Sequence, residues 1–390
     1  MPIQFTEEQL AFQDMARRFA QREVEPLANR IDAEEHTPDE LIAKAAEVGL
    51  FGLYIPEEYG GAGADVVSAC LVAEEIAKAS PAFAGALTVQ MILCPKTVEL
   101  LGTEEQKRRI LPLSASGERL IAYSQSEPAG AANVAAHLTR LEPDGEGAWR
   151  LDGAKLFCTQ SVAKTYLVMC KTRTHDGREG YGCIIVEQEA EGFRAAPYEH
   201  KLGWRGTNTG PISFDNVRIE ADGILGDILN GGINHRAANQ ANVLAHAATS
   251  LGCAEGMYDK TLEYVKQRRL YGRDMSELQP VSYWLAEAYA KIQACRAMLY
   301  TSAAAFDRGE MPVLANNVCK AWIGDTAFEI CSRLLQLWGG SGIMDSTGVN
   351  RYMRDAKAKC MAEGASEMHY AIIANQLFHG RPTLVPPGMG

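Results

Sequence analysis

The sequence lacks the marks of several classes of protein. Its 10 cysteines form no C-x-x-C pair and no Cys/His cluster at zinc spacing, so we expect buried apolar cysteines and neither a disulfide framework nor a metal site. No run approaches the roughly 18 apolar residues of a membrane span, and the first residues lack the pattern of a secretory signal. The formal net charge of -11 argues against binding to nucleic acid, which requires clustered lysines and arginines. These absences predict a cytoplasmic protein with no membrane or nucleic-acid partner.

Familiar catalytic signatures are also missing. No G-x-G-x-x-G follows an early strand and no P-loop is present, so dinucleotide binding through a Rossmann unit is not supported. The segment GGSGIM, 339–344, resembles a nucleophile elbow, but Ile343 occupies the place of the second glycine. His246 lies in an alanine-rich segment and is interpreted as a packed core or interface histidine, not as a base. Any chemistry is therefore expected to use a bound cofactor.

The patterns that are present change twice along the chain. A length of 390 residues suggests two or three structural units. The first third is typical of helices: Thr6 and Gln9 fit a capping box, and further helices are predicted over 38–48 and 66–79.

A second texture begins near residue 120. The runs AWRLDG, TYLVMCKT, YGCIIVEQ and PISFDNVRI are separated by turn pairs, which predicts a small antiparallel sheet or barrel. After GDILNGG the pattern is helical again. The order is α, then β, then α, and we expect domains over 1–119, 120–230 and 231–390.

Several segments, in this order and at suitable separations, resemble one known family. They are PEEYGGAGA (56–64), AYSQSEPAGAAN (122–133), DGAKLFCTQ (152–160), KLGWRGTNTGPISFDNVRI (201–219), QRRLYGRDMSELQ (267–279), LLQLWGGSGI (334–343) and RYMRDAKAKCMAEGASE (351–367). The series is similar to the acyl-CoA dehydrogenase flavoproteins. The resemblance implies an α+β fold with an N-terminal helical domain, a middle β-barrel-like domain and a C-terminal four-helix bundle. It also implies a homotetramer that binds FAD and passes electrons from an acyl-CoA substrate to electron-transferring flavoprotein.

The resemblance assigns one group of FAD-binding residues to the β region. Tyr123, Gln125 and Ser126 supply the strand end that runs along the flavin, and Phe157 and Thr159 take the family's Trp and Thr positions beside the ring. Hydrogen-bond donors aimed at the ring would favour its anionic reduced form.

A second group lies near the C-terminal helices. Arg268 matches an arginine that reaches the FAD pyrophosphate from a neighbouring subunit, and Gln279 lies near the same cofactor. Gln336, Gly339 and Gly340 match a turn against the adenosine half, where missing side chains allow close backbone approach. Taken alone, the two glycines also fit an ordinary helix C-cap.

The stretch MAEGASE, 361–367, contains the expected catalytic base. By resemblance, Glu363 removes the α-proton of an acyl thioester while the β-carbon gives hydride to the flavin, and Gly364 lets the thioester come close. Exclusion of water by the substrate would raise the pKa of Glu363 toward neutrality. The alternative is a surface carboxylate at a helix start, which is our interpretation of Glu367.

Some positions depart from the family pattern. Ala132 has lost a hydroxyl, Val243 replaces an arginine common near the substrate, and Asn242 stands where one subgroup keeps an alternative glutamate base. Ala362 and Ala365 replace larger residues. The added space suggests a branched, cyclic or aromatic acyl group.

Two other readings stay open. One is a family relative that catalyses enoyl-CoA reduction or elimination on an unusual thioester. The other is a non-catalytic flavoprotein, an assembly partner or a nucleic-acid-binding protein that kept the fold.

Overall fold

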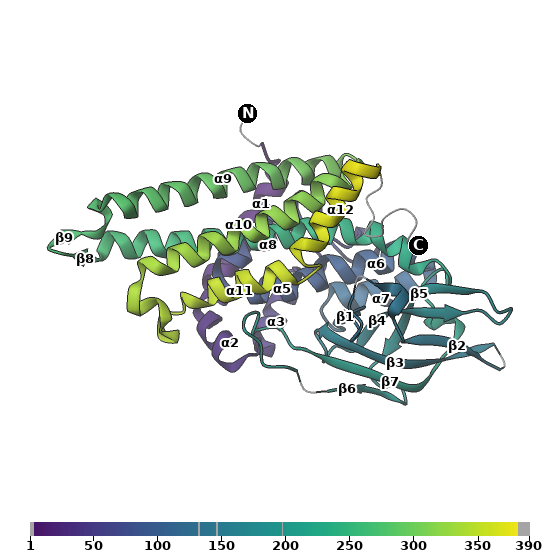
Figure 1. Ribbon diagram of the computed structural model, residues 1–390. Coiled ribbons are helices and arrows are strands. Elements are labelled where there is room, and N and C mark those ends of the chain that lie inside the picture. The colour runs from purple at the N-terminus through teal and green to yellow at the C-terminus, as the bar shows by residue number, and fades with distance from the viewer. Residues whose placement is uncertain (1–3, 132, 146, 197, 381–390) are drawn as a thin grey trace.

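The computed structural model describes residues 4–131, 133–145, 147–196 and 198–380, and helices account for 59% of it. A curled sheet lies at one side of the molecule, and a long pair of antiparallel helices extends away from it (Figure 1). The N-terminal helices pack beneath this pair and beside the sheet.

The first part of the chain is helical, as predicted. The capping box at the start of α1 is confirmed, since the Thr6 hydroxyl accepts the backbone N–H of Gln9 and the Gln9 side chain accepts that of Thr6. The helices predicted over 38–48 and 66–79 are confirmed as α3 and α4. The elements are α1 (Glu7–Phe19), η1 (Ala20–Val24), η2 (Glu25–Leu27), α2 (Ala28–Glu34), α3 (Asp39–Glu47), η3 (Glu57–Tyr59), α4 (Val66–Ala79), α5 (Pro81–Thr88), η4 (Val89–Leu93), α6 (Cys94–Leu101) and α7 (Glu104–Ala115).

One segment corrects the sequence analysis. Pro81–Leu101, which joins α5, η4 and α6 into one apolar stretch, has the length and composition of a membrane span. Within its most apolar window, 78% of the residues are buried inside the protein. The expectation that no such segment exists was wrong, because a helix surrounded by other helices is apolar on every side.

The middle of the chain forms a sheet in the order β1-β4-β2-β3-β7-β6, with β5 on the other side of β4. The predicted strand region is confirmed, but β4 runs parallel to both β1 and β2. The expected antiparallel pairing is confirmed for β2–β3, β3–β7, β4–β5 and β6–β7, but it was wrong for β4 with β1 and β2, because pairing between distant strands depends on tertiary context. The strands are β1 (Ile121–Ser124), β2 (Arg140–Asp144), β3 (Ala148–Thr159), β4 (Thr165–Arg173), β5 (Glu179–Glu187), β6 (Phe193–Ala195) and β7 (Thr209–Ile219). Short helices η5 (Val134–Ala136) and η6 (Ala221–Gly223) flank it.

The last part of the chain is again helical. The hairpin of α8 and α9 carries β8 and β9 at the end that lies farthest from the sheet (Figure 1). The elements are α8 (Gly231–Gln267), β8 (Arg269–Leu270), β9 (Arg273–Asp274), η7 (Met275–Glu277), α9 (Gln279–Asp307), α10 (Val313–Leu337), η8 (Gly339–Ile343), η9 (Asp345–Thr347), α11 (Asn350–Met361) and α12 (Ser366–His379).

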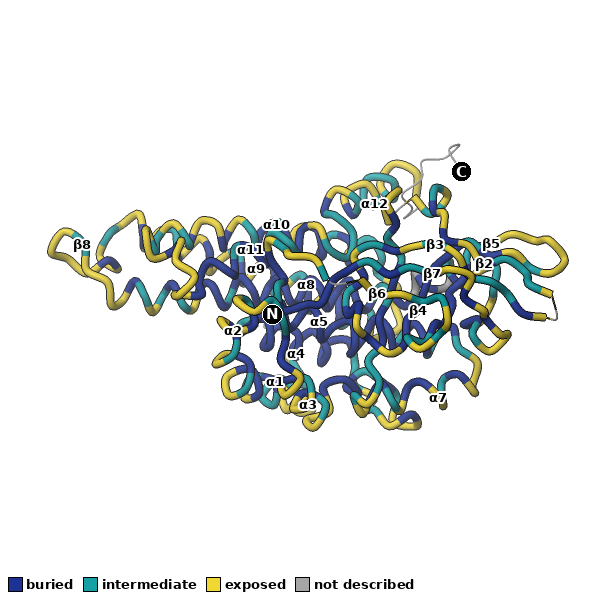
Figure 2. The backbone as a smooth tube through the Cα atoms, turned by 90° about the horizontal axis from the view of Figure 1, so that it is seen from below, coloured by how far each residue is buried: buried dark blue, intermediate teal, exposed yellow. Residues whose placement is uncertain are grey.

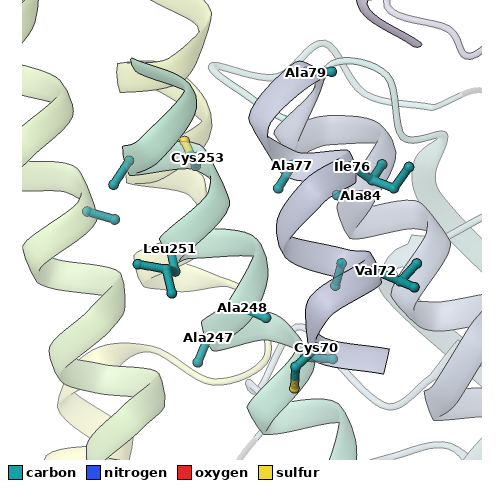
Figure 3. Close-up of a cluster of buried hydrophobic side chains, with 14 of the residues drawn as sticks. Cys70, Val72, Ile76, Ala77, Ala79, Ala84, Ala247, Ala248, Leu251 and Cys253 are labelled. Atoms are coloured by element: carbon teal, nitrogen blue, oxygen red, sulfur yellow. The ribbon is translucent and has the colours of Figure 1, made fainter. Parts of the chain in front are cut away.

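The core forms where α4 and α5 pack against α8. These helices are buried at the centre of the molecule, whereas the β8–β9 end is largely exposed (Figure 2). Small side chains, including Ala77 on α4 and Ala247 and Ala248 on α8, fill the space between the helices (Figure 3). A Cβ atom at Gly252 would lie 2.2 Å from the Glu74 carbonyl oxygen, and one at Gly256 would lie 2.3 Å from that of Lys78. Glycine therefore allows the two backbones to approach closely.

A buried charged cluster joins α4, α8 and α9. One guanidinium nitrogen of Arg296 lies 2.6 Å from a carboxylate oxygen of Glu74 and 2.6 Å from one of Glu255. The Tyr300 hydroxyl donates a hydrogen bond to the other Glu74 oxygen. All ten cysteines are free and buried, so the interpretation of them as core residues is confirmed.

Candidate active site

Glu363 and Gly364 form a tight turn between α11 and α12. Their φ angles are 54° and 86°, which places both residues in the left-handed region. That conformation is uncommon and costly for a residue other than glycine. His369 lies with Nε2 3.0 Å from the Glu363 carbonyl oxygen, and the Lys320 ammonium donates to the carbonyl oxygen of Gly364. The turn is thus fixed from both α12 and α10.

Glycine at position 364 suits this geometry, and its contribution can be measured. A Cβ atom there would lie 2.0 Å from Met368 Cε, the end of a flexible side chain that can move aside, so the cost comes mainly from the left-handed backbone, about 1–2 kcal/mol for an L-residue. We expect Gly364→Ala to lower the free energy of unfolding by at least that amount in a denaturant titration. Gly340→Ala is the matched control, because a Cβ there would meet nothing within 4 Å. Equal stability of the two variants would contradict this account.

The Glu363 carboxylate faces α8. Asn242 donates from Nδ2 to Oε2 over 2.9 Å, and His246 Nε2 lies 3.7 Å from Oε1. The side chain of Glu363 is 23% exposed, whereas that of His246 is almost fully buried. Within the described part of the chain, Asn242 Oδ1 is buried without a hydrogen-bond partner. The carboxylate is therefore held by polar groups on one side and open on another.

Burial sets the proton affinity of this site. Desolvation raises the pKa of Glu363 above its usual value, while the positive charges of Lys359 and Lys320 and the Asn242 hydrogen bond act in the opposite direction. Burial also lowers the pKa of Lys320 to about 8. A carboxyl group with a raised pKa is suited to proton transfer near neutral pH.

The predicted flavin residues of the sheet lie close to one another. The Tyr123 hydroxyl donates to Gln125 Oε1 over 2.6 Å, and the Tyr123 ring stacks on His235 with centroids 4.5 Å apart. The backbone N–H of Leu156 donates to the Ser126 carbonyl oxygen over 2.8 Å, so β3 passes beside the end of β1.

Phe157 and Thr159 lie at an irregularity in β3. The pairing of β3 with β7 shifts between Lys155 and Cys158, and Phe157 has a φ of 55°. Its ring is 67% exposed, while Thr159 is half-buried. A bulge re-aims side chains, and here it leaves an aromatic ring free to contact a planar ligand.

The other predicted cofactor residues are far from this cluster. The C-terminal end of α10 meets the end of α8, where Trp338 stacks on Tyr264 with centroids 4.1 Å apart. The β8–β9 hairpin is at the same end of α8, away from the sheet (Figure 1). The predicted cofactor residues at this end are all exposed, and they are Arg268, Gln279, Gln336, Gly339 and Gly340. One copy of the chain therefore does not bring the two groups together.

The predicted substrate-side residues and Glu367 remain to be placed in the structure. Val243 is buried next to Asn242 on α8, and Gly364 adjoins Glu363. Ala132 lies outside the described residues. Glu367 is exposed in the first turn of α12, as its interpretation as a helix-start carboxylate predicts.

Sequence reasoning missed two residues of the site. Lys359 was not singled out, and His246 was interpreted only as a packed residue. The one signal for Lys359 is that it precedes Glu363 by four residues, although Glu363 lies beyond the end of α11 and is not its helical neighbour. His246 has no comparable signal, since its proximity to Glu363 depends on how α8 crosses the turn after α11.

Comparison with known proteins shows to which class of protein this fold belongs. A helical N-terminal part, a middle sheet and a C-terminal helical part define a three-part flavoprotein oxidoreductase fold. The chain matches the N-terminal, middle and C-terminal domain models of acyl-CoA dehydrogenase over residues 6–118, 122–217 and 240–378. It belongs to the acyl-CoA dehydrogenase family, whose members depend on FAD and act on acyl-CoA.

Three relatives illustrate the similarity. The chain is 34% identical over 379 residues to an acyl-CoA dehydrogenase of Bacillus subtilis, covering 96% of this chain and 99% of the relative. It is 31% identical over 374 residues to a 3-(aryl)acrylate reductase of Clostridium sporogenes, covering 96% and 99%. The structure of butyryl-CoA dehydrogenase from Megasphaera elsdenii superposes with a TM-score of 0.92 at 29% identity, covering 97% of this chain and all of that one.

Proposed function

We propose that the chain is an FAD-dependent acyl-CoA dehydrogenase in which Glu363 removes the α-proton of an acyl thioester, giving a 2,3-enoyl-CoA. The observation that carries the proposal is the carboxylate of Glu363, raised in pKa by burial and held by Asn242 in a strained turn. FAD, when bound, supplies the acceptor for the β-hydride.

The residues around Glu363 suit a base. Asn242 donates to Oε2 and so holds the carboxylate in one orientation from which it can receive the proton. The partial exposure of the side chain gives a substrate access, and the carboxylate lies against Asn242 and His246 of α8. The thioester would cover the exposed side and exclude water, which strengthens the base.

The cofactor would lie between two copies of the chain. Tyr123, Gln125, Ser126, Phe157 and Thr159 would contact the flavin half, since the exposed Phe157 ring and the strand end lie together. The exposed residues at the far end of α8 would reach the pyrophosphate and adenosine half of FAD in a neighbouring subunit of a homotetramer. They are Arg268, Gln279, Gln336, Gly339 and Gly340.

Arg268→Ala tests this arrangement. Arg268 is exposed at the end of α8, so its loss costs little folding energy but removes a charge-assisted contact to phosphate. We expect the purified variant to retain clearly less FAD after gel filtration, about 10-fold weaker in binding for a contact of about 1.5 kcal/mol. Arg269→Ala is the control, because the Arg269 guanidinium is already occupied by the Gly272 carbonyl oxygen and Asp274. Full FAD retention by Arg268→Ala would argue against the arrangement.

The acyl group is proposed to be branched, cyclic or aromatic. Ala362 and Ala365, on either side of the Glu363–Gly364 turn, leave space that larger residues would fill. The name of the Clostridium sporogenes relative, an aryl-acrylate reductase, supports an aromatic group and also supports the second candidate, reduction of an enoyl thioester.

An anaerobic titration of the purified protein with straight, branched, cyclic and aromatic acyl-CoAs tests the function. Bleaching of the flavin by one group, with formation of the matching enoyl-CoA, would support dehydrogenation. Bound flavin that no acyl-CoA reduces, but that an enoyl-CoA reoxidises after the flavin has been reduced with dithionite, would favour the reductase. Electron-transferring flavoprotein, as electron acceptor, and a cytoplasmic location complete the proposal, together with domains over 1–119, 120–230 and 231–390.

A further inference from the structure

Two buried residues continue the line of polar contacts behind Glu363. His246 on α8 is 2% exposed and Lys359 on α11 is 1% exposed. The Lys359 ammonium lies 3.0 Å from His246 Nδ1, and His246 Nε2 lies 3.7 Å from Glu363 Oε1. A histidine and a lysine therefore connect in series to the carboxylate that the proposed function uses as base.

The contacts determine which imidazole nitrogen carries the proton. In its charged form Lys359 is only a donor, so it then donates to Nδ1, and the proton of neutral His246 lies on Nε2. The Thr88 hydroxyl, 3.4 Å from Nε2, donates to the Gly85 carbonyl oxygen and can only accept from the imidazole. Nε2–H thus points toward Thr88 and Glu363. Burial, reinforced by Lys359, keeps the pKa of His246 well below its usual value, so the ring stays neutral.

Lys359 is an isolated buried cation. Among the described residues, its ammonium hydrogen bonds only to His246, and it lies 4.2 Å from the centre of the Trp204 ring, an arrangement typical of a cation–π contact. Burial lowers the pKa of Lys359 well below its usual value, and the negative charge of Glu363 acts against that shift. A buried charge is retained when a nearby opposite charge compensates it.

The other charged groups around the turn contact backbone atoms and not the carboxylate oxygens of Glu363. Lys320 on α10 donates to backbone carbonyl oxygens of Lys359 and Gly364, and His369 on α12 contacts the Glu363 carbonyl oxygen. Asp355 on α11 accepts the backbone N–H of Trp204 over 2.6 Å, and burial raises its pKa to about 6. Of the residues that the structure describes, Asn242 and His246 are the two that face the carboxylate oxygens themselves.

We propose that His246 and Lys359 form a positioning pair for Glu363, in which Lys359 fixes the imidazole tautomer and His246 presents its Nε2–H to the oxygen that Asn242 leaves free. The positive charge of Lys359 polarises the neutral imidazole of His246. Together the two residues favour the ionised form of the buried Glu363 carboxylate. This inference rests on the proposed role of Glu363 as base.

The test is the pH dependence of flavin reduction by the best acyl-CoA in stopped-flow experiments on the holoenzyme. A base acts in its ionised form, so the rate falls as pH drops through its pKa. Lys359→Met removes the compensating charge, raises the pKa of Glu363, and is expected to move this acid limb to higher pH by about one unit. Lys357→Met on the same helix is the control, because Lys357 lies over the Phe328 ring and is not among the charged groups that shift the pKa of Glu363. An unshifted acid limb in Lys359→Met would overturn the proposal.

A second readout does not depend on turnover. Infrared difference titration follows the carboxyl band that disappears in Glu363→Gln, and we expect its midpoint to rise in Lys359→Met. His246→Leu should produce a similar rise, whereas His246→Gln, which keeps a donor near the Nε2 position, should restore most of the normal midpoint. If Lys359→Met does not fold, the two His246 variants decide the question alone. Equal carboxyl midpoints in His246→Leu and His246→Gln would then overturn the proposal. Loss of activity in Glu363→Gln together with unshifted midpoints in all these variants would leave the base assignment intact and reject only the pair.

Discussion

Glu363→Gln is expected to slow flavin reduction by an acyl-CoA by about 10²–10⁴-fold, the usual contribution of a general base. The amide cannot take up the α-proton, but it has the same size and can still hydrogen bond with Asn242 through its oxygen. FAD content and thermal stability should therefore stay near normal. Stopped-flow absorbance of the flavin under anaerobic conditions measures the effect.

Glu367→Gln is the matched control for this experiment. Glu367 is the other glutamate of the same segment and is exposed in the first turn of α12. Its replacement should leave the rate within about twofold, since an exposed charge at a helix start contributes only about 0.3–1 kcal/mol and does so to stability. Reduction at the normal rate in Glu363→Gln would remove Glu363 as the base.

Glu74→Ala is expected to lower the free energy of unfolding by about 3–5 kcal/mol. The change leaves the Tyr300 hydroxyl without its acceptor and leaves the Arg296 guanidinium with Glu255 as its remaining carboxylate. Arg296 is mostly buried, and an uncompensated buried polar group carries the full cost of desolvation. Urea titration followed by circular dichroism measures the loss, and a shift of the midpoint without a change of slope would locate it in the native state.

An exposed ion pair provides the comparison. Glu287→Ala breaks the contacts with Arg333 and Lys291, in which every side chain is at least 31% exposed. Such pairs contribute about 0–1 kcal/mol. Similar losses of unfolding free energy in the two variants would show that the cluster between α4, α8 and α9 contributes no more to stability than an exposed ion pair.

Local structure could be predicted where local chemistry determines it. The capping box of Thr6 and Gln9 and the helices α3 and α4 follow from short-range patterns. The parallel pairing of β4 with β1 and β2 does not, because strand order depends on distant contacts. The apolar stretch Pro81–Leu101 was overlooked, since its polar positions are interspersed and only its burial shows its role.

The same division applies to the candidate site. Glu363 was identified because its neighbours are small and because the surrounding segment resembles a family. Asn242 was singled out only through the family resemblance, and His246 was not linked to the site at all, since the two residues precede Glu363 by 121 and 117 positions of sequence. The left-handed backbone of the turn could be anticipated only at Gly364, because glycine commonly adopts a positive φ. Glu363 also has a positive φ, which is uncommon for a residue with a Cβ atom.

The close approach of α4 and α8 also limits how this chain can change by recombination. Gly252 and Gly256 lie on the same helix as Asn242 and His246, so the backbone of α4 sets the depth at which the residues facing Glu363 are held. A foreign N-terminal segment with a slightly different α4 would shift α8 as a whole. The three parts of the sequence are therefore not interchangeable modules, and the first and last must be inherited as a matched set.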